Sequence, residues 1–140
     1  MKPLEIGVMF WADCPPREKL RQIKAFGVNC GQLGLAGDTD ISPATAQAWK
    51  TALAEESFTL VTVFTAYNGE SYADIPTVQK TVGFIPPATR AEREARTLAA
   101  SDFAAAAGVP SLATHVGFVP HDRTHPDYVE IGRASCRERV

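Results

Sequence analysis

The chain has 140 residues and a formal net charge of −2, with 45% hydrophobic and 21% charged residues. These values are ordinary for one globular domain, and they offer no basic face for nucleic acid and no Lys/Arg run for a membrane surface. The apolar runs, such as that around 60–63, are too short to span a bilayer, and Glu5 stands where a signal peptide would be apolar. Cys14, Cys30 and Cys136 share no CxxC spacing, so we expect reduced thiols in a cytoplasmic protein.

The chain begins with a strand signal followed by a helix signal. Residues 5–10 (EIGVMF) form a short apolar run that predicts a buried strand. Two prolines follow Asp13 and predict the start of a helix over 17–26, which Gly27 ends. Its expected inward face is Leu20, Ile23 and Phe26.

The same alternation continues through the middle of the chain. Residues 28–35 (VNCGQLGL) predict a second strand, weakened by two glycines. Ser42 before a proline is typical of a helix N-cap. The helix behind it is expected to place together Ala48, Trp49, Ala52 and Leu53. Residues 58–66 (FTLVTVFTA) are β-branched and aromatic, and they give the clearest strand signal in the chain.

A third helix and a fourth strand complete the series. The run Thr89-Arg90-Ala91-Glu92 has the capping-box pattern and predicts the start of an alanine-rich helix that Gly108 ends. Its expected inward residues are Ala95, Leu98, Ala99, Phe103 and Ala106. Residues 111–118 (SLATHVGF) predict the fourth strand.

The order β-α-β-α-β-α-β predicts right-handed crossovers and a parallel α/β sheet. A doubly wound open sheet and a closed barrel both have this alternation. The first strand–helix turn, 11–16, contains no glycine, so it lacks the phosphate loop of the open-sheet class. A (β/α)₈ TIM barrel needs roughly 250 residues. We therefore predict the N-terminal, incomplete half of such a barrel over residues 1–130.

The last ten residues, 131–140 (IGRASCRERV), differ from everything before them. They carry no apolar period, and the whole string resembles the translation of a sequencing-library adapter. A genuine basic, disordered tail is the alternative. We expect the natural sequence to end near Val129, in which case Cys136 has no role.

Sites in both architectures lie at the carboxyl ends of the strands. Five residues there are candidates: Trp11, Gln32, Tyr67, Asn68 and His115. An imidazole at the end of strand four is able to bind a metal, hydrogen-bond a sugar hydroxyl or move a proton, and a buried histidine bonded to backbone is the alternative. An indole after strand one suits a sugar face, and a core residue at the barrel rim is the alternative.

Three other features carry weaker signals. Segment 67–88 is long for a βα loop and is interpreted either as an ordered loop over the barrel mouth or as an insertion packed outside. His121, Asp122 and His125 lie between prolines, which favours a solvated turn over a metal site. Asp13 is interpreted as a helix-start residue.

Taken in order, the stretches EIGVMF, REKLRQIKAFGVNCGQLGL, LVTVFTAYNGESY, TVGFIPPATRAEREARTLAASDFAAAAGV and SLATHVGF resemble the sugar phosphate isomerase/epimerase group, the xylose isomerase-like TIM barrels. The resemblance covers about residues 5–129. It implies an isomerase or epimerase of sugar metabolism that moves a proton on a sugar or polyol. His115 is the implied catalytic residue, and Trp11, Gln32, Tyr67 and Asn68 are the implied substrate-binding residues. Gln32 stands where many members have an acidic residue.

The resemblance also implies a divalent metal (Mn, Mg, Co or Zn), with ligands on later strands that this chain lacks. The parent protein is then an enzyme, and the truncated chain is inactive. Its open edges and exposed apolar surface predict self-association. Three other functions stay open: a polyol dehydratase, an abasic-site endonuclease, which the lack of a basic face disfavours, and a non-catalytic sugar-binding barrel.

Overall fold

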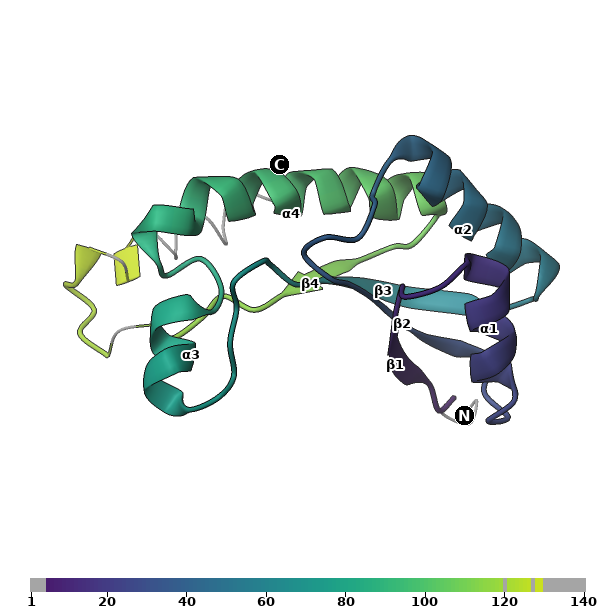
Figure 1. Cartoon of the computed structure of the whole chain (residues 1–140), viewed down its shortest axis with the longest axis horizontal. Helices are drawn as coiled ribbons and strands as arrows, with labels where there is room; N and C mark the ends of the chain where they lie inside the picture. The colour runs from purple at the N-terminus through teal and green to yellow at the C-terminus, as the bar shows by residue number, and fades with distance from the viewer. Residues whose placement is uncertain (1–4, 120, 127, 130–140) are drawn as a thin grey trace. The chain divides into compact units, whose positions relative to one another are not determined.

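The computed structural model describes residues 5–119, 121–126 and 128–129 (Figure 1). Its elements are β1 (Val8–Trp11), α1 (Pro16–Lys24), β2 (Cys30–Leu35), α2 (Pro43–Glu55), β3 (Thr59–Thr65), α3 (Ile75–Thr81), α4 (Pro87–Ala107) and β4 (Leu112–Thr114). The chain divides into two compact units. Unit 1 is Met1–Asn68 with Arg96–Thr114, and unit 2 is Gly69–Ala95 with His115–Val140. The predicted tail, 131–140 with Cys136, lies outside the described residues.

Unit 1 contains a parallel sheet whose strands lie in the order β1-β2-β3-β4. In a doubly wound sheet the first strand lies inside the strand order, because the winding reverses there. Here each strand instead adds next to the preceding one, as in a barrel. The predicted α/β fold and the barrel interpretation are therefore confirmed for the four strands present.

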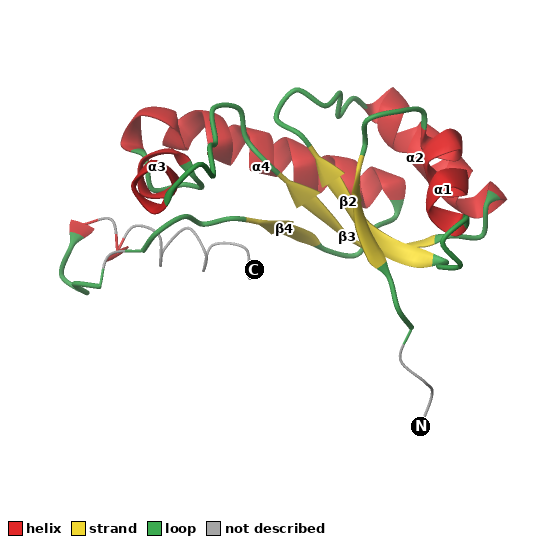
Figure 2. Cartoon of the chain, turned by 60° about the horizontal axis from the view of Figure 1, so that its bottom comes forward, coloured by secondary structure: helices red, strands yellow, loops and turns green. Residues whose placement is uncertain are grey.

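One face of the sheet is covered by helices, and this side holds the core (Figure 2). Alternate strand residues, including Phe10, Leu33 and Val63, face Leu20 of α1 and Trp49 of α2. The ring centroids of Phe10 and Trp49 lie 6.5 Å apart. Trp49 is 2% exposed and is the largest fully buried side chain among the described residues. This period-two pattern leaves the opposite residues of each strand on the other face.

The start signals of the first two helices are confirmed. Pro16 begins α1, and Ser42 caps α2 by accepting a hydrogen bond from the Thr45 N–H at 3.3 Å. Two inward positions were predicted wrongly. Phe26 is 77% exposed because α1 ends at Lys24, and Ala48 of α2 is exposed.

The prediction for α4 was wrong in both its start and its face. The helix begins at Pro87, so Thr89 lies inside the first turn and is no cap. Of the predicted inward residues only Phe103 is buried, and Leu98 is 63% exposed. The buried positions are Arg93, Thr97, Ala100, Phe103, Ala104 and Ala107. Arg93 and Thr97 thus belong to the buried face of α4, and a prediction from apolar periodicity does not include polar residues in a buried face.

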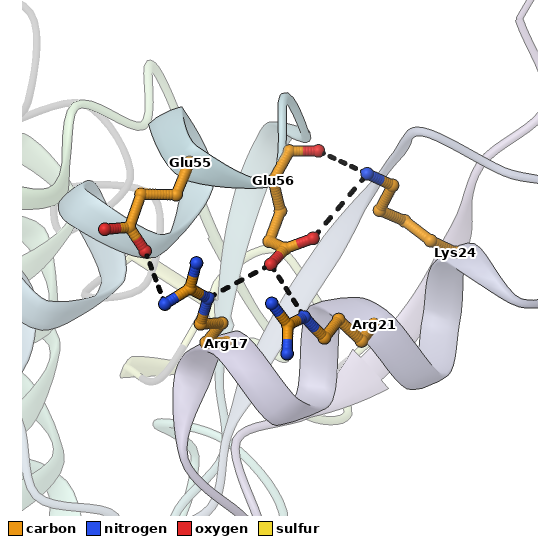
Figure 3. A network of polar contacts seen from close by, with 5 residues as sticks. All are labelled: Arg17, Arg21, Lys24, Glu55 and Glu56. Atoms are coloured by element: carbon orange, nitrogen blue, oxygen red, sulfur yellow. Dashed lines mark hydrogen bonds and ion pairs between the residues drawn. The ribbon is translucent and has the colours of Figure 1, made fainter.

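A charged network joins α1 to the end of α2 (Figure 3). Arg17 and Arg21 each place Nε near Glu56 Oε1, at 3.2 and 2.9 Å, and Lys24 donates to the Glu56 carbonyl at 2.6 Å. Partial burial raises the pKa of Glu56, but the hydrogen bonds and charges of Arg21, Arg17 and Lys24 outweigh it, so the pKa lies below its ordinary value. The network fixes α1 against α2 on the outside of unit 1.

Unit 2 contains α3 and a close crossing of two backbone segments. Asp74 caps α3 by accepting from the Thr77 N–H at 2.8 Å. Segment 67–88 was predicted as a loop, so α3 was missed, although an Asp N-cap with Pro76 in the first turn is close to the signal that marked α2. At the crossing, the Phe84 N–H donates to the Val116 carbonyl at 2.8 Å.

In the described part of the chain, no helix is long and apolar enough to cross a membrane.

Candidate functional site

Trp11 lies on the uncovered face of the sheet at the carboxyl end of β1. It pairs with Gly34 of β2, which pairs with Phe64 of β3. A Cβ on Gly34 would lie 2.6 Å from Trp11 Cε3, so only glycine lets the indole lie across β2. The Trp11 and Phe64 rings meet edge to face, with their centroids 6.4 Å apart. The indole is therefore held by its neighbours while 41% exposed, as a sugar-stacking platform requires.

Gln32 lies on the same face, two residues before Gly34. It pairs with Met9 of β1 and Thr62 of β3 and is partly buried. The register shifts beside it, because Val61 is an extra residue opposite the Gly31/Gln32 step. The structure thus brings Gln32 and Trp11 onto one surface, with Gln32 nearer the amino ends of the strands.

Tyr67 and Asn68 follow β3 but are placed differently from Trp11. Tyr67 is 6% exposed, and its hydroxyl lies 2.7 Å from Thr97 Oγ1 and accepts from Thr114 Oγ1 at 2.8 Å. Asn68 is exposed and packs against Gly37, where a Cβ would lie 2.4 Å from its Oδ1. Tyr67 therefore ties the ends of β3 and β4 to α4, and its role in substrate binding stays a prediction.

His115 belongs to unit 2 and directly follows the last residue of β4. The predicted strand 111–118 is shorter than expected, because the chain turns at Gly117 (φ 100°) and Val116 joins the crossing with Phe84. His115 is exposed, and its Nδ1 lies 2.7 Å from the Tyr72 hydroxyl. His115 is thus the candidate that belongs to unit 2, whereas Trp11, Gln32, Tyr67 and Asn68 belong to unit 1.

Arginines of α4 support both units, and sequence reasoning missed them. In unit 2, Arg90 donates to the Phe84 carbonyl at 2.8 Å, and buried Arg93 donates to the Gly83 carbonyl. In unit 1, Arg96 donates to the Ala36 and Thr39 carbonyls at 2.8 and 2.9 Å. The Ala36 and Thr39 carbonyls lie in the loop after β2, and the Gly83 and Phe84 carbonyls lie between α3 and α4, so α4 holds a connecting loop in each unit. The arginines look like a solvated helix face in sequence, and only their loop partners reveal the role.

The weaker candidates have structural roles. Asp122 accepts from the N–H and hydroxyl of Thr124 at 2.8 and 2.7 Å, so the segment around His121 and His125 is the predicted turn. Asp13 does not cap α1, where Pro15 is the N-cap; it pairs with Lys19, whose hydrogen bond lowers the pKa of that carboxyl.

Metal-ligating side chains do not cluster in the described part of the chain. Among its residues, no three His, Cys, Asp or Glu side chains gather in an arrangement that would hold an ion. The donor set that a divalent cation requires is thus not assembled within this part of the chain.

These features define a class of protein: a parallel, barrel-type α/β fold with polar and aromatic residues at its strand ends. The structure matches a solved xylose isomerase domain protein from Planctomyces limnophilus with a TM-score of 0.84, at 34% identity over 94% of this chain. The match covers 46% of that protein's chain. The resemblance to the xylose isomerase-like TIM barrels is therefore confirmed, and this chain has the fold of part of such a barrel. No family model matches the chain, and the comparison with curated proteins gave no match.

Proposed function

We propose that this chain supplies the first four strands of a longer sugar (phosphate) isomerase or epimerase. The observation that carries this is the likeness to the xylose isomerase domain protein, which extends over nearly all of this chain but under half of that one. The substrate would be a small sugar or polyol, not nucleic acid, and a homo-oligomer is compatible with the proposal. Buried Cys30 and partly exposed Cys14, both free thiols, fit a cytoplasmic enzyme.

The residues of this chain would bind and orient the substrate. Trp11 offers its indole face to the apolar face of a sugar ring, and Gln32 on the same surface offers an amide to hydroxyl groups. His115 is the proposed catalytic residue, because an imidazole exchanges protons near neutral pH and contacts hydroxyl or carbonyl oxygens. Asn68 is a further proposed hydrogen-bonding residue after β3.

Metal dependence is proposed for the longer protein alone. The described residues do not form a metal site, so we derive no step through a metal. A divalent cation such as Mn²⁺, Mg²⁺, Co²⁺ or Zn²⁺ would be held by residues beyond this chain and would supply polarisation of a substrate oxygen.

The first experiment is to read the source DNA past the codon for Glu130 and to express the complete frame. Incubation with aldoses, ketoses and polyols in D₂O, followed by NMR, should show isomer or epimer formation with deuterium at the reacting carbon. Loss of water from a polyol would instead identify a dehydratase, and cleavage of abasic DNA an endonuclease. Binding without turnover would identify a non-catalytic barrel, and any of these three results would overturn the proposal.

The His115→Asn variant tests the proposed catalytic residue in that complete protein. Loss of general acid–base catalysis should lower kcat by roughly 10²–10⁴-fold. His121→Asn is the matched control, because His121 lies in the exposed turn of the same unit and its variant should keep wild-type kcat. Equal activities of the two variants would remove His115 from the mechanism.

A further inference from the structure

His115, the proposed catalytic residue, makes a side-chain contact with Tyr72. The Tyr72 hydroxyl lies 2.7 Å from His115 Nδ1, and the two rings meet edge to face with centroids 5.8 Å apart. The residues are 43 positions apart in sequence. Both are exposed, so the contact lies at the surface of unit 2, where a ligand has access.

Unit 2 holds the two partners in place by separate sets of hydrogen bonds. Beside Tyr72, the Ser71 N–H donates to Thr81 Oγ1 at 3.1 Å, and Thr81 Oγ1 donates to the Thr77 carbonyl at 2.8 Å. Beside His115, the Val116 carbonyl accepts from the Phe84 N–H at 2.8 Å. The pair therefore has a backbone frame on both sides, which a chance surface contact between two side chains lacks.

The chemistry of the two groups favours one direction of the hydrogen bond. A phenol is a stronger acid than the N–H of neutral imidazole, and an unprotonated imidazole nitrogen is a strong acceptor. Burial raises the pKa of the Tyr72 hydroxyl, and nearby Glu70 adds to this while Arg93 opposes it, so the hydroxyl keeps its proton at neutral pH and is available as a donor. The role of Nδ1 depends on the tautomer of His115, and it accepts from Tyr72 when the imidazole proton is on Nε2.

We propose that Tyr72 is a positioning residue for His115: its hydroxyl donates to Nδ1, so that neutral His115 carries its proton on Nε2 and presents that N–H to a sugar or polyol oxygen. The second half of this statement rests on the proposed function. The first half is a property of this chain alone. A hydrogen bond to one ring nitrogen favours one tautomer and one ring orientation of the histidine.

The tautomer is measured by ¹⁵N NMR of the neutral histidine rings in the full 140-residue chain. In the wild-type spectrum, His115 should show a larger Nε2–H fraction than His121 or His125. Tyr72→Phe should return His115 to the mixture seen for those two residues, whereas Tyr128→Phe, a matched tyrosine in unit 2, should leave it unchanged. A His115 tautomer ratio equal to that of His121 in wild type, or an Nδ1–H form, overturns the proposal without reference to any variant.

The substrate half is measured in the complete enzyme. Tyr72→Phe should lower kcat at least about tenfold with little change in KM, because a mixture of tautomers and ring orientations lowers the competent fraction. If the tautomer result is as expected but Tyr72→Phe keeps wild-type kcat, the presentation of Nε2–H to substrate is wrong. If the wild-type complete enzyme shows no sugar turnover, the proposed function fails while the tautomer result stands.

Discussion

Gly83 and Gly117 lie where two backbone segments cross, one before α4 and one after His115. Both residues have positive φ, 72° and 100°, and each approaches the backbone of the other segment closely. A Cβ at position 83 would lie 2.2 Å from the Val116 carbonyl carbon, and one at position 117 would lie 2.4 Å from the Val82 carbonyl oxygen. Backbone atoms on the opposing side cannot rotate away, so these positions need glycine for space as well as for conformation.

Gly83→Ala is therefore expected to open the crossing. The free energy of unfolding of the variant should fall by more than the roughly 1 kcal/mol that alanine costs at positive φ, because the added Cβ also displaces the Val116 backbone. Hydrogen exchange of the Phe84 amide should become faster, because its acceptor is the Val116 carbonyl. Gly69→Ala is the control: φ is 78°, but nothing lies within 4 Å of the added Cβ. Equal exchange rates at Phe84 in the two variants would contradict the role of the close approach.

At the scale of elements, α1 and α2 are joined by their apolar faces and by the Glu56 network. The Glu56 carboxylate is 12% exposed and meets Arg17, Arg21 and Lys24, whereas neighbouring Glu55 is 45% exposed and meets Arg17 alone, at 3.4 Å. An exposed single pair contributes little to stability, while a shared carboxylate in a network contributes more. The helix pair should therefore depend on Glu56 and not on Glu55.

Glu56→Gln should lower the Tm of the chain at neutral pH more than Glu55→Gln does. The pKa of Glu56 is lowered on folding from its ordinary value of 4.5, so its stabilising contribution is fully present above that pH. The contribution is lost as pH falls through the folded-state pKa, which lies below 4.5. Thermal unfolding followed by circular dichroism between neutral and acid pH should show the two Tm values converging below that point. A Tm difference that persists unchanged in acid would contradict this account.

The sequence predicted where helices and strands lie along the chain more accurately than it predicted which of their residues are buried. The predicted bounds of β1 to β3, α1 and α2 lie within a few residues of the observed bounds. Apolar runs marked the strands, and Pro16 and the Ser42-Pro43 pair marked the helix starts. The face of α4 was misjudged because its buried stripe includes Arg93 and Thr97, whose partners are a loop carbonyl and Tyr67. An apolar pattern cannot predict a polar residue that is buried through a partner elsewhere in the chain.

At the scale of the whole molecule, the described helices of unit 1 pack on one face of its sheet. The other face presents Met9, Trp11 and Val61, which are 45%, 41% and 50% exposed. Parallel sheets are otherwise buried on both faces, and in a barrel this second face closes on itself to form the interior. The uncovered face is therefore the surface that the proposed remainder of the barrel would cover.

The 140-residue chain is accordingly expected to self-associate through that face. Light scattering or analytical ultracentrifugation should show a smaller mean mass after Met9→Gln combined with Val61→Thr, because both changes reduce exposed apolar area there. Phe26→Ser is the control, since Phe26 is 77% exposed but lies in the turn after α1 and is not a strand residue. Equal reduction by Phe26→Ser would show general stickiness instead of a defined surface.

The amino-acid sequence by itself determined the alternation of strands and helices and the parallel sheet, because apolar periodicity and helix caps are local signals. The resemblance to the xylose isomerase-like barrels was also visible in the order of the sequence segments. It also marked Trp11 and His115 as strand-end residues. Only the tertiary structure decided that Tyr67 is buried between threonines, that β4 ends before His115, and that Tyr72 bonds His115. These outcomes depend on contacts between residues tens of positions apart, such as 43 for Tyr72 and His115, and no local pattern records which distant partners meet.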